Sequence, residues 1–122
     1  MKDENKIQNE IQLQCNSSKC KLWRNNVGVC FQAPKHLRHQ STQTVRYGLC
    51  NGSSDLVGYT VTEITPEMVG QHVAVFTAIE VKTLRGKASD LQHKFVDQVI
   101  KDGGRAGLAR SVTEAKEIID AN

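Results

Sequence analysis

Apolar residues along the chain fall into short runs, some spaced like strands and others like helices. The clearest strand is residues 73–81, which read VAVFTAIEV and are rich in β-branched and aromatic side chains. The chain continues as Lys82, so we expect a central strand over residues 73–82. Further strands are expected over residues 22–31 (with a turn or bulge at 25–28), 46–49, 55–59 and 105–110.

Three helices are expected between and around these strands. In residues 3–14, Ile7 and Ile11 lie one helical turn apart. Residues 89–101 carry a broad apolar face and are followed by two glycines, which favour a helix end. The last helix begins at Ser111, where SVTE has the pattern of a capping box, and a single helical turn is expected at Pro66. The order α-β-β-β-α-β-α predicts one α/β domain over residues 1–122, with a mixed central β-sheet flanked by helices.

Composition is that of an ordinary globular protein, with 24% charged and 39% hydrophobic residues. No apolar run approaches the roughly 20 residues that cross a bilayer, and the N-terminus has no signal-peptide core. We therefore expect an intracellular, cytoplasmic protein that does not bind membranes. Its four cysteines are therefore expected to be reduced thiols. Their spacing matches no common zinc pattern.

The net charge of +3 is small, but the charges are unevenly distributed. Residues 11–54 contain no Asp or Glu, whereas the acids concentrate in the C-terminal half. A basic region beside acidic residues suits an enzyme that acts on a polyanion, because it holds phosphates near carboxylates that repel them. A solvated basic surface without this role explains the charge pattern equally well.

Asp55, Glu80 and Lys82 are the residues whose chemistry stands out. Glu80 and Lys82 alternate on a strand, so both point to one face, roughly 7 Å apart along the backbone. Asp55 lies on a second short apolar segment, which could pair beside the first. Two carboxylates and a lysine would suit Mg²⁺ or Mn²⁺ and metal-assisted hydrolysis of a phosphodiester. The alternative is an ion-pair network at the strand end.

Five features in order along the chain carry a resemblance to a known family. They are Glu10, RNNVG at residues 24–28, GSSDL at 52–56, IEVK at 79–82, and Gln92 with Phe95. In these features the chain resembles the PD-(D/E)xK nuclease superfamily, and within it the short, stand-alone phage form of the VRR-NUC (virus-type replication-repair nuclease) domain. Ser54 stands where the superfamily has proline. Proline is not a metal ligand there, so the ligand set is unaffected.

The resemblance implies a restriction-endonuclease-like core and a Mg²⁺- or Mn²⁺-dependent DNA endonuclease. Related short forms are homodimers that cut branched DNA, notably the four-way (Holliday) junctions of DNA repair and recombination. The implied metal-binding set is Asp55, Glu80, the backbone carbonyl of Val81, and Glu10. Lys82 would orient or deprotonate the attacking water or stabilise charge on the phosphate, and Gln92 would position Lys82, the water or the phosphate.

DNA contacts are expected from the basic residues of the first half, mainly with phosphates rather than with bases. As a group these residues are Lys21, Arg24, Lys35, Arg38 and Arg46. His36 and His39 are expected to be loop residues rather than metal ligands. The alternatives are a flap or nonspecific DNA nuclease, a non-catalytic nucleic-acid-binding module, and a structural protein. Dimerisation would distinguish a junction-cutting nuclease from a flap or nonspecific nuclease, because symmetric cleavage of a four-way junction needs two sites related by a two-fold axis.

Overall fold

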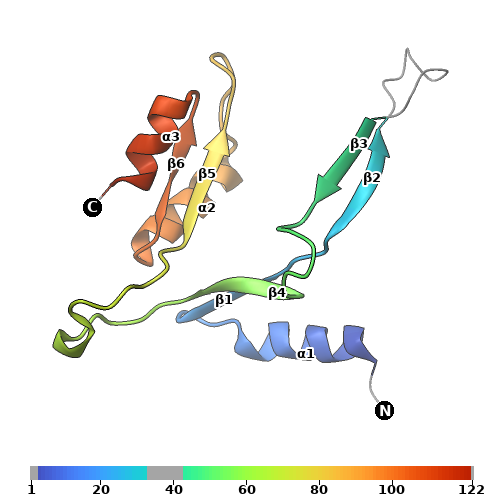
Figure 1. Ribbon diagram of the computed structural model, residues 1–122, viewed down its shortest axis with the longest axis vertical. Coiled ribbons are helices and arrows are strands. Elements are labelled where there is room, and N and C mark those ends of the chain that lie inside the picture. The colour runs from blue at the N-terminus through green and yellow to red at the C-terminus, as the bar shows by residue number, and fades with distance from the viewer. Residues whose placement is uncertain (1–2, 33–42, 122) are drawn as a thin grey trace. The chain divides into compact units, whose positions relative to one another are not determined.

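The computed structural model of the chain describes residues 3–32 and 43–121 (Figure 1). Its elements, in order, are α1 (Glu4–Cys15), β1 (Cys20–Arg24), β2 (Gly28–Gln32), β3 (Gln43–Tyr47), β4 (Leu56–Thr60), the 3-10 turn η2 (Pro66–Met68), β5 (Thr77–Val81), α2 (Asp90–Lys101), β6 (Arg105–Ala109) and α3 (Val112–Ile119). The mixed α/β class expected from the sequence is therefore confirmed. The part of the chain that the structure describes contains no helix long and apolar enough to span a membrane.

The N-terminal helix α1 is attached to β1 mainly by polar side chains. It begins at Asp3, whose carboxylate accepts a hydrogen bond from the Lys6 N–H at 2.9 Å. At its other end, Asn16 exchanges two hydrogen bonds with the backbone of Leu22, at 2.9 and 3.3 Å. These bonds connect the end of α1 to the middle of β1.

Strand β1 pairs antiparallel with β4, in register from Cys20 opposite Thr60 to Arg24 opposite Leu56. Trp23 and Tyr59 lie close together on this pair, with ring centroids 5.8 Å apart. The pairing places residue 55 directly at the start of β4.

The expected strand over residues 22–31 is two strands with different partners. The chain leaves β1 after Arg24, and β2 pairs antiparallel with β3 from Gly28 opposite Tyr47 to Gln32 opposite Gln43. The break at residues 25–27 comes where the sequence allowed a turn or bulge. The break occurs at Asn25, whose side chain is buried and hydrogen-bonded to the segment before β4. The pairing of β1 with β4 therefore ends at Arg24.

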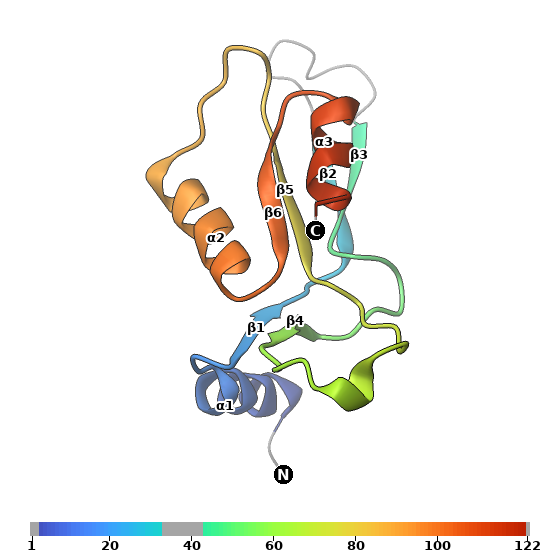
Figure 2. The ribbon, with the colours of Figure 1, turned by 90° about the vertical axis from the view of Figure 1, so that its left-hand side faces the viewer.

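The C-terminal elements form three layers, with the parallel pair β5–β6 between α2 and α3 (Figure 2). Val99 of α2 and Ala109 of β6 are almost completely buried. Gly107 of β6 allows α3 to approach the strand, because a Cβ there would lie 2.8 Å from Ile118. Strand β5 begins at Thr77 rather than at residue 73. It ends at Val81, so Lys82 follows directly after its last residue.

The ends of the helices follow local sequence signals. After α2, Gly103 has a φ of +96°, and the N–H groups of Gly103 and Gly104 donate to the carbonyls of Ile100 and Val99. This is the Schellman arrangement that the two glycines predict. At α3, the Ser111 hydroxyl accepts from the Glu114 N–H as expected, but the Glu114 carboxylate accepts from the Arg110 N–H. The reciprocal capping box therefore forms at α2, between Ser89 and Gln92, and not at α3.

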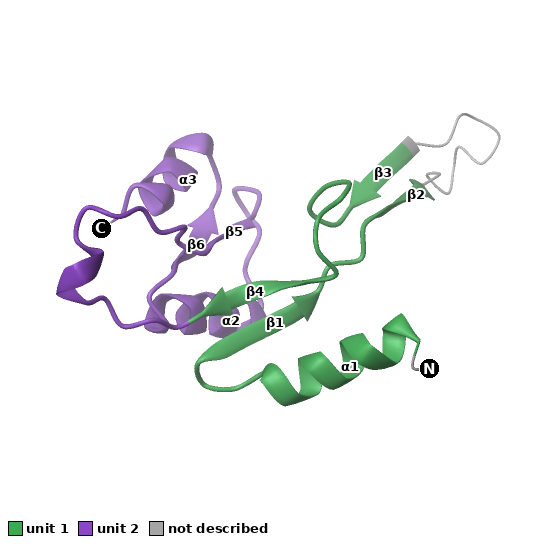
Figure 3. Cartoon of the chain, turned by 60° about the horizontal axis from the view of Figure 1, so that its bottom comes forward, with its two compact units in different colours: residues 1–60 green, residues 61–122 purple. Residues whose placement is uncertain are grey.

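The chain divides into two compact units, residues 1–60 and 61–122 (Figure 3). Within the described residues the strands form three two-stranded sheets, β1–β4, β2–β3 and β5–β6, where the sequence predicted one mixed sheet. The connection that opens the second unit contains η2, which begins at Pro66 as expected. There the pKa of Glu67 is lowered by hydrogen bonds from its own backbone and from the Thr65 side chain.

Substituting Gly103 by alanine tests the left-handed end of α2. No atom lies within 4 Å of the added Cβ, so the cost comes from the backbone conformation alone. We expect Gly103→Ala to lose about 1 kcal/mol of unfolding free energy, measured by urea denaturation, and Gly103→Asn to lose less. Equal stability of Gly103→Ala and the unmodified protein would contradict this helix end.

Candidate active site

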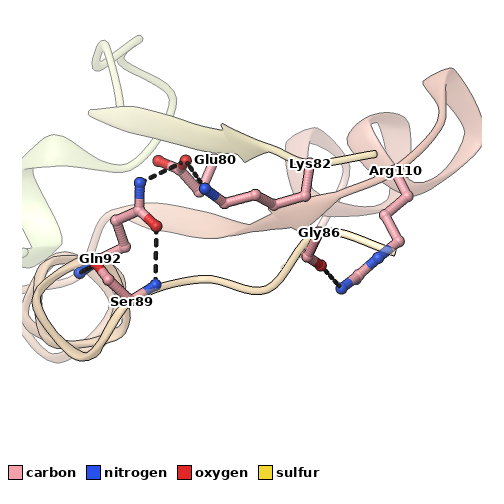
Figure 4. Close-up of polar contacts among 6 residues, drawn as sticks. All are labelled: Glu80, Lys82, Gly86, Ser89, Gln92 and Arg110. Atoms are coloured by element: carbon pink, nitrogen blue, oxygen red, sulfur yellow. Dashed lines mark hydrogen bonds and ion pairs between the residues drawn. The ribbon is translucent and has the colours of Figure 1, made fainter. Parts of the chain in front are cut away.

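Glu80 and Lys82 meet at the end of β5, as their alternation along the strand predicts. The Lys82 Nζ lies 3.3 Å from the Glu80 Oε1, and the two side chains are 21% and 31% exposed (Figure 4). Both point to the face of the sheet on which α2 lies, since Gln92 of that helix also reaches Glu80. An ion pair exposed to this degree contributes little to stability, at most about 1 kcal/mol.

Gln92 uses both ends of its side-chain amide. Its Nε2 donates to the Glu80 Oε1 at 2.9 Å, while its Oε1 accepts from the Ser89 N–H at 2.9 Å. The Gln92 N–H in turn donates to the Ser89 hydroxyl at 3.2 Å, which completes the capping box (Figure 4). Because a backbone N–H can only donate and a carboxylate only accept, these partners fix which way the amide points. Gln92, in the first turn of α2, therefore caps the helix and also holds the Glu80 carboxylate.

The contacts of Glu80 leave one carboxylate oxygen available. Gln92 and Lys82 both reach Oε1, and no described residue forms a hydrogen bond or ion pair with Oε2. Val81 follows Glu80 at the end of the strand and supplies a further backbone carbonyl. Such hard oxygen donors fit Mg²⁺ or Mn²⁺. Among the described residues no group of three or more His, Cys, Asp and Glu side chains lies together.

The loop between β5 and α2 is held by Arg110, at the end of β6. The Arg110 Nη2 donates to the Gly86 carbonyl at 2.8 Å (Figure 4). The Lys82 N–H donates to the Ala109 carbonyl at 3.1 Å. Gly86 also donates to the Thr83 carbonyl at 3.1 Å. The loop is thus attached at Lys82 and at Gly86 to the end of β6 and the residue after it. Arg110 was not among the residues expected from the sequence, because its place beside the end of β5 follows only from the pairing of β5 with β6.

Asp55 belongs to the other unit, at the residue before β4. Its side chain is exposed and forms no hydrogen bond or ion pair with described residues, whereas its backbone carbonyl accepts from the Asn25 N–H at 2.8 Å. Glu10 is an exposed residue of α1 in that same unit. The structure thus describes Asp55 and Glu10 in one unit, and Glu80, Lys82 and Gln92 in the other.

The basic residues expected to contact DNA differ in their surroundings. Arg46 is exposed on β3, opposite Val29, and Lys21 is half-buried on β1. The Arg24 guanidinium donates to the side-chain oxygens of Gln8 and Asn9 on α1, so part of its donor set is engaged within the protein. Two further expected contacts, Lys35 and Arg38, lie outside the described residues, as do His36 and His39. Their contacts with DNA stay predictions.

Similarity to one known family extends over most of the chain. The family model of the VRR-NUC domain matches residues 2–113 of the 122-residue chain. The chain belongs to the VRR-NUC domain family. The resemblance found in the sequence is thereby confirmed, and the chain is a nuclease domain by family. No curated protein and no solved structure matches it significantly.

Replacing Gln92 by alanine tests its double role. The substitution removes the bond to Glu80 and one half of the capping box, so we expect a loss of about 1–2 kcal/mol of unfolding free energy in urea denaturation. Gln98→Ala is the matched control, because Gln98 is exposed on the same helix and bonds only across one turn, to Asp102. Equal, small losses for the two variants would show that the contacts of Gln92 contribute nothing in solution.

Proposed function

We propose that this VRR-NUC domain is a Mg²⁺- or Mn²⁺-dependent endodeoxyribonuclease that acts on branched DNA, four-way junctions included, as a homodimer. One observation carries the proposal. Glu80 is held by Gln92 and Lys82 through a single oxygen, which leaves the other for a cation beside an ammonium group. A carboxylate and a lysine at a strand end, in a chain of nuclease family, support phosphodiester hydrolysis.

The metal would be held by oxygen ligands. We propose Asp55, Glu80 and the Val81 carbonyl as ligands, with Glu10 adding a carboxylate directly or through water. The Asp55 side chain is exposed, and neither it nor Oε2 of Glu80 is bonded to a described residue, which suits this role. When bound, a divalent cation polarises a phosphoryl oxygen and makes its own water a stronger nucleophile.

The chain's own residues supply the remaining parts of the mechanism. Lys82, 3.3 Å from Glu80, places a positive charge where the attacking water is oriented or where charge builds up on the phosphate. Gln92 keeps Glu80 in one orientation and therefore acts as a positioning residue. The bond from Arg110 to Gly86 holds the loop that joins Lys82 to the start of α2.

DNA binding is proposed to depend on the acid-free stretch of residues 11–54. Its basic side chains would contact phosphates, which favours recognition of shape over sequence. A homodimer would bring two sites to the two strands of a junction that are cut. A flap or nonspecific nuclease uses the same chemistry as a monomer, and the acid-free stretch by itself also fits a non-catalytic nucleic-acid-binding module.

Cleavage of a panel of labelled substrates separates these functions. The panel is a four-way junction, a flap, linear duplex and single-stranded DNA, each with Mg²⁺ and with Mn²⁺. We expect paired, symmetric cuts confined to the junction, and at least about a 100-fold slower rate for Lys82→Ala. Lys94→Ala, at an exposed lysine of α2, should cut at the normal rate.

The other outcomes of this experiment are equally informative. Cutting of several substrates would keep the nuclease and discard junction specificity. Binding of DNA without cleavage in either metal would overturn the nuclease and favour the binding module. Unchanged cleavage by a folded Lys82→Ala would remove Lys82 from the mechanism.

A further inference from the structure

Asn25 is the most buried polar side chain of the described residues, with 8% of its surface exposed. It lies directly after β1, where the chain leaves the ladder with β4. Burying an amide is costly unless its donors and acceptor find partners. The hydrogen-bond partners of Asn25 therefore indicate which segment this residue holds in place.

All the bonds of Asn25 go to the segment that precedes β4. Its Nδ2 donates to the Ser53 hydroxyl at 2.7 Å and to the Ser54 carbonyl at 2.9 Å. Its Oδ1 accepts from the Leu49 N–H at 3.0 Å, and its own N–H donates to the Asp55 carbonyl at 2.8 Å. One residue thus contacts both ends of residues 49–55, a segment with no helix or strand of its own.

Ser53 extends this arrangement into a closed turn. Its hydroxyl accepts from Asn25 and donates to the Cys50 carbonyl at 2.7 Å, and its N–H donates to the same carbonyl at 3.0 Å. The backbone of residues 50–55 is therefore tied to a single buried amide. The Asp55 side chain, by contrast, is exposed and forms no hydrogen bond or ion pair with described residues.

We propose that Asn25 is a positioning residue for Asp55, acting through Ser53 and the Ser54 carbonyl, so that residues 49–55 present the Asp55 carboxylate to the divalent cation. The inference rests on the proposed function, in which Asp55 is a metal ligand. Outer residues that orient a ligand contribute to metal affinity, because an unoriented carboxylate loses freedom when it binds. Only an amide suits this position, since it must donate twice and accept once.

Binding of Mn²⁺ alone, without DNA, tests this role by a measurement independent of cleavage. Titration calorimetry would compare the unmodified protein with Asn25→Ala, Ser53→Ala and Asp55→Asn. We expect Asn25→Ala and Ser53→Ala to weaken Mn²⁺ binding about tenfold or more at temperatures well below their unfolding transitions. Asn26→Ala is the matched control, because Asn26 is the exposed neighbour of the same residue type and its side chain forms no hydrogen bond with described residues.

The variants also separate the possible failures. If Asp55→Asn weakens Mn²⁺ binding but Asn25→Ala and Ser53→Ala bind normally, the positioning role is wrong while the metal site stands. If Asp55→Asn binds normally, Asp55 is no ligand, and the proposed metal site fails together with the inference. Should Asn25→Ala not fold, Ser53→Ala decides alone, since Ser53 is only half-buried.

Discussion

The side-chain amide of Gln92 is the interaction on which the C-terminal unit most depends. It joins the first turn of α2 to the carboxylate at the end of β5, through bonds of 2.9 Å to the Ser89 N–H and to Glu80. The same side chain therefore caps the start of α2 and orients the Glu80 carboxylate. A change that frees the start of α2 also frees Glu80, although neither lies in the most buried part of the unit, where Val99 and Ala109 pack.

The N-terminal unit uses the same chemistry at Asn25. Both amides donate and accept at once, so each links two segments that a carboxylate or an ammonium group could not link. In both places an acidic oxygen has no bond to a described residue: Oε2 of Glu80, and the exposed carboxylate of Asp55. The Glu80–Lys82 pair is partly exposed and adds little to stability, which is compatible with the proposed role of both residues at a phosphate.

The sequence predicted the elements with strong local signals and missed contacts made across the chain. Apolar runs placed β5, β6 and the helices, and alternation correctly put Glu80 and Lys82 on one face. A turn or bulge at residues 25–28 was expected, but the different partners of β1 and β2 were not. They depend on bonds from Asn25 to residues more than twenty positions away. Pattern alone also placed the capping box at Ser111, although the side chain that decides it, Glu114, bonds to Arg110. The Arg110–Gly86 bond has no local signal at all. The roles of Asp55, Glu10 and the basic residues rest on family membership and chemistry, and these stay predictions.

In the proposed function, Asp55 and Glu80 bind the same divalent cation. Calorimetric titration of Mn²⁺ into the unmodified protein, Asp55→Asn, Glu80→Gln and the double variant tests it most directly, because ligands of one ion are coupled energetically. If the ion is shared, we expect each single variant to lose most of the binding and the double variant to lose much less than the sum of the two losses. Additive losses, or a single variant that binds Mn²⁺ normally, would contradict a shared metal site.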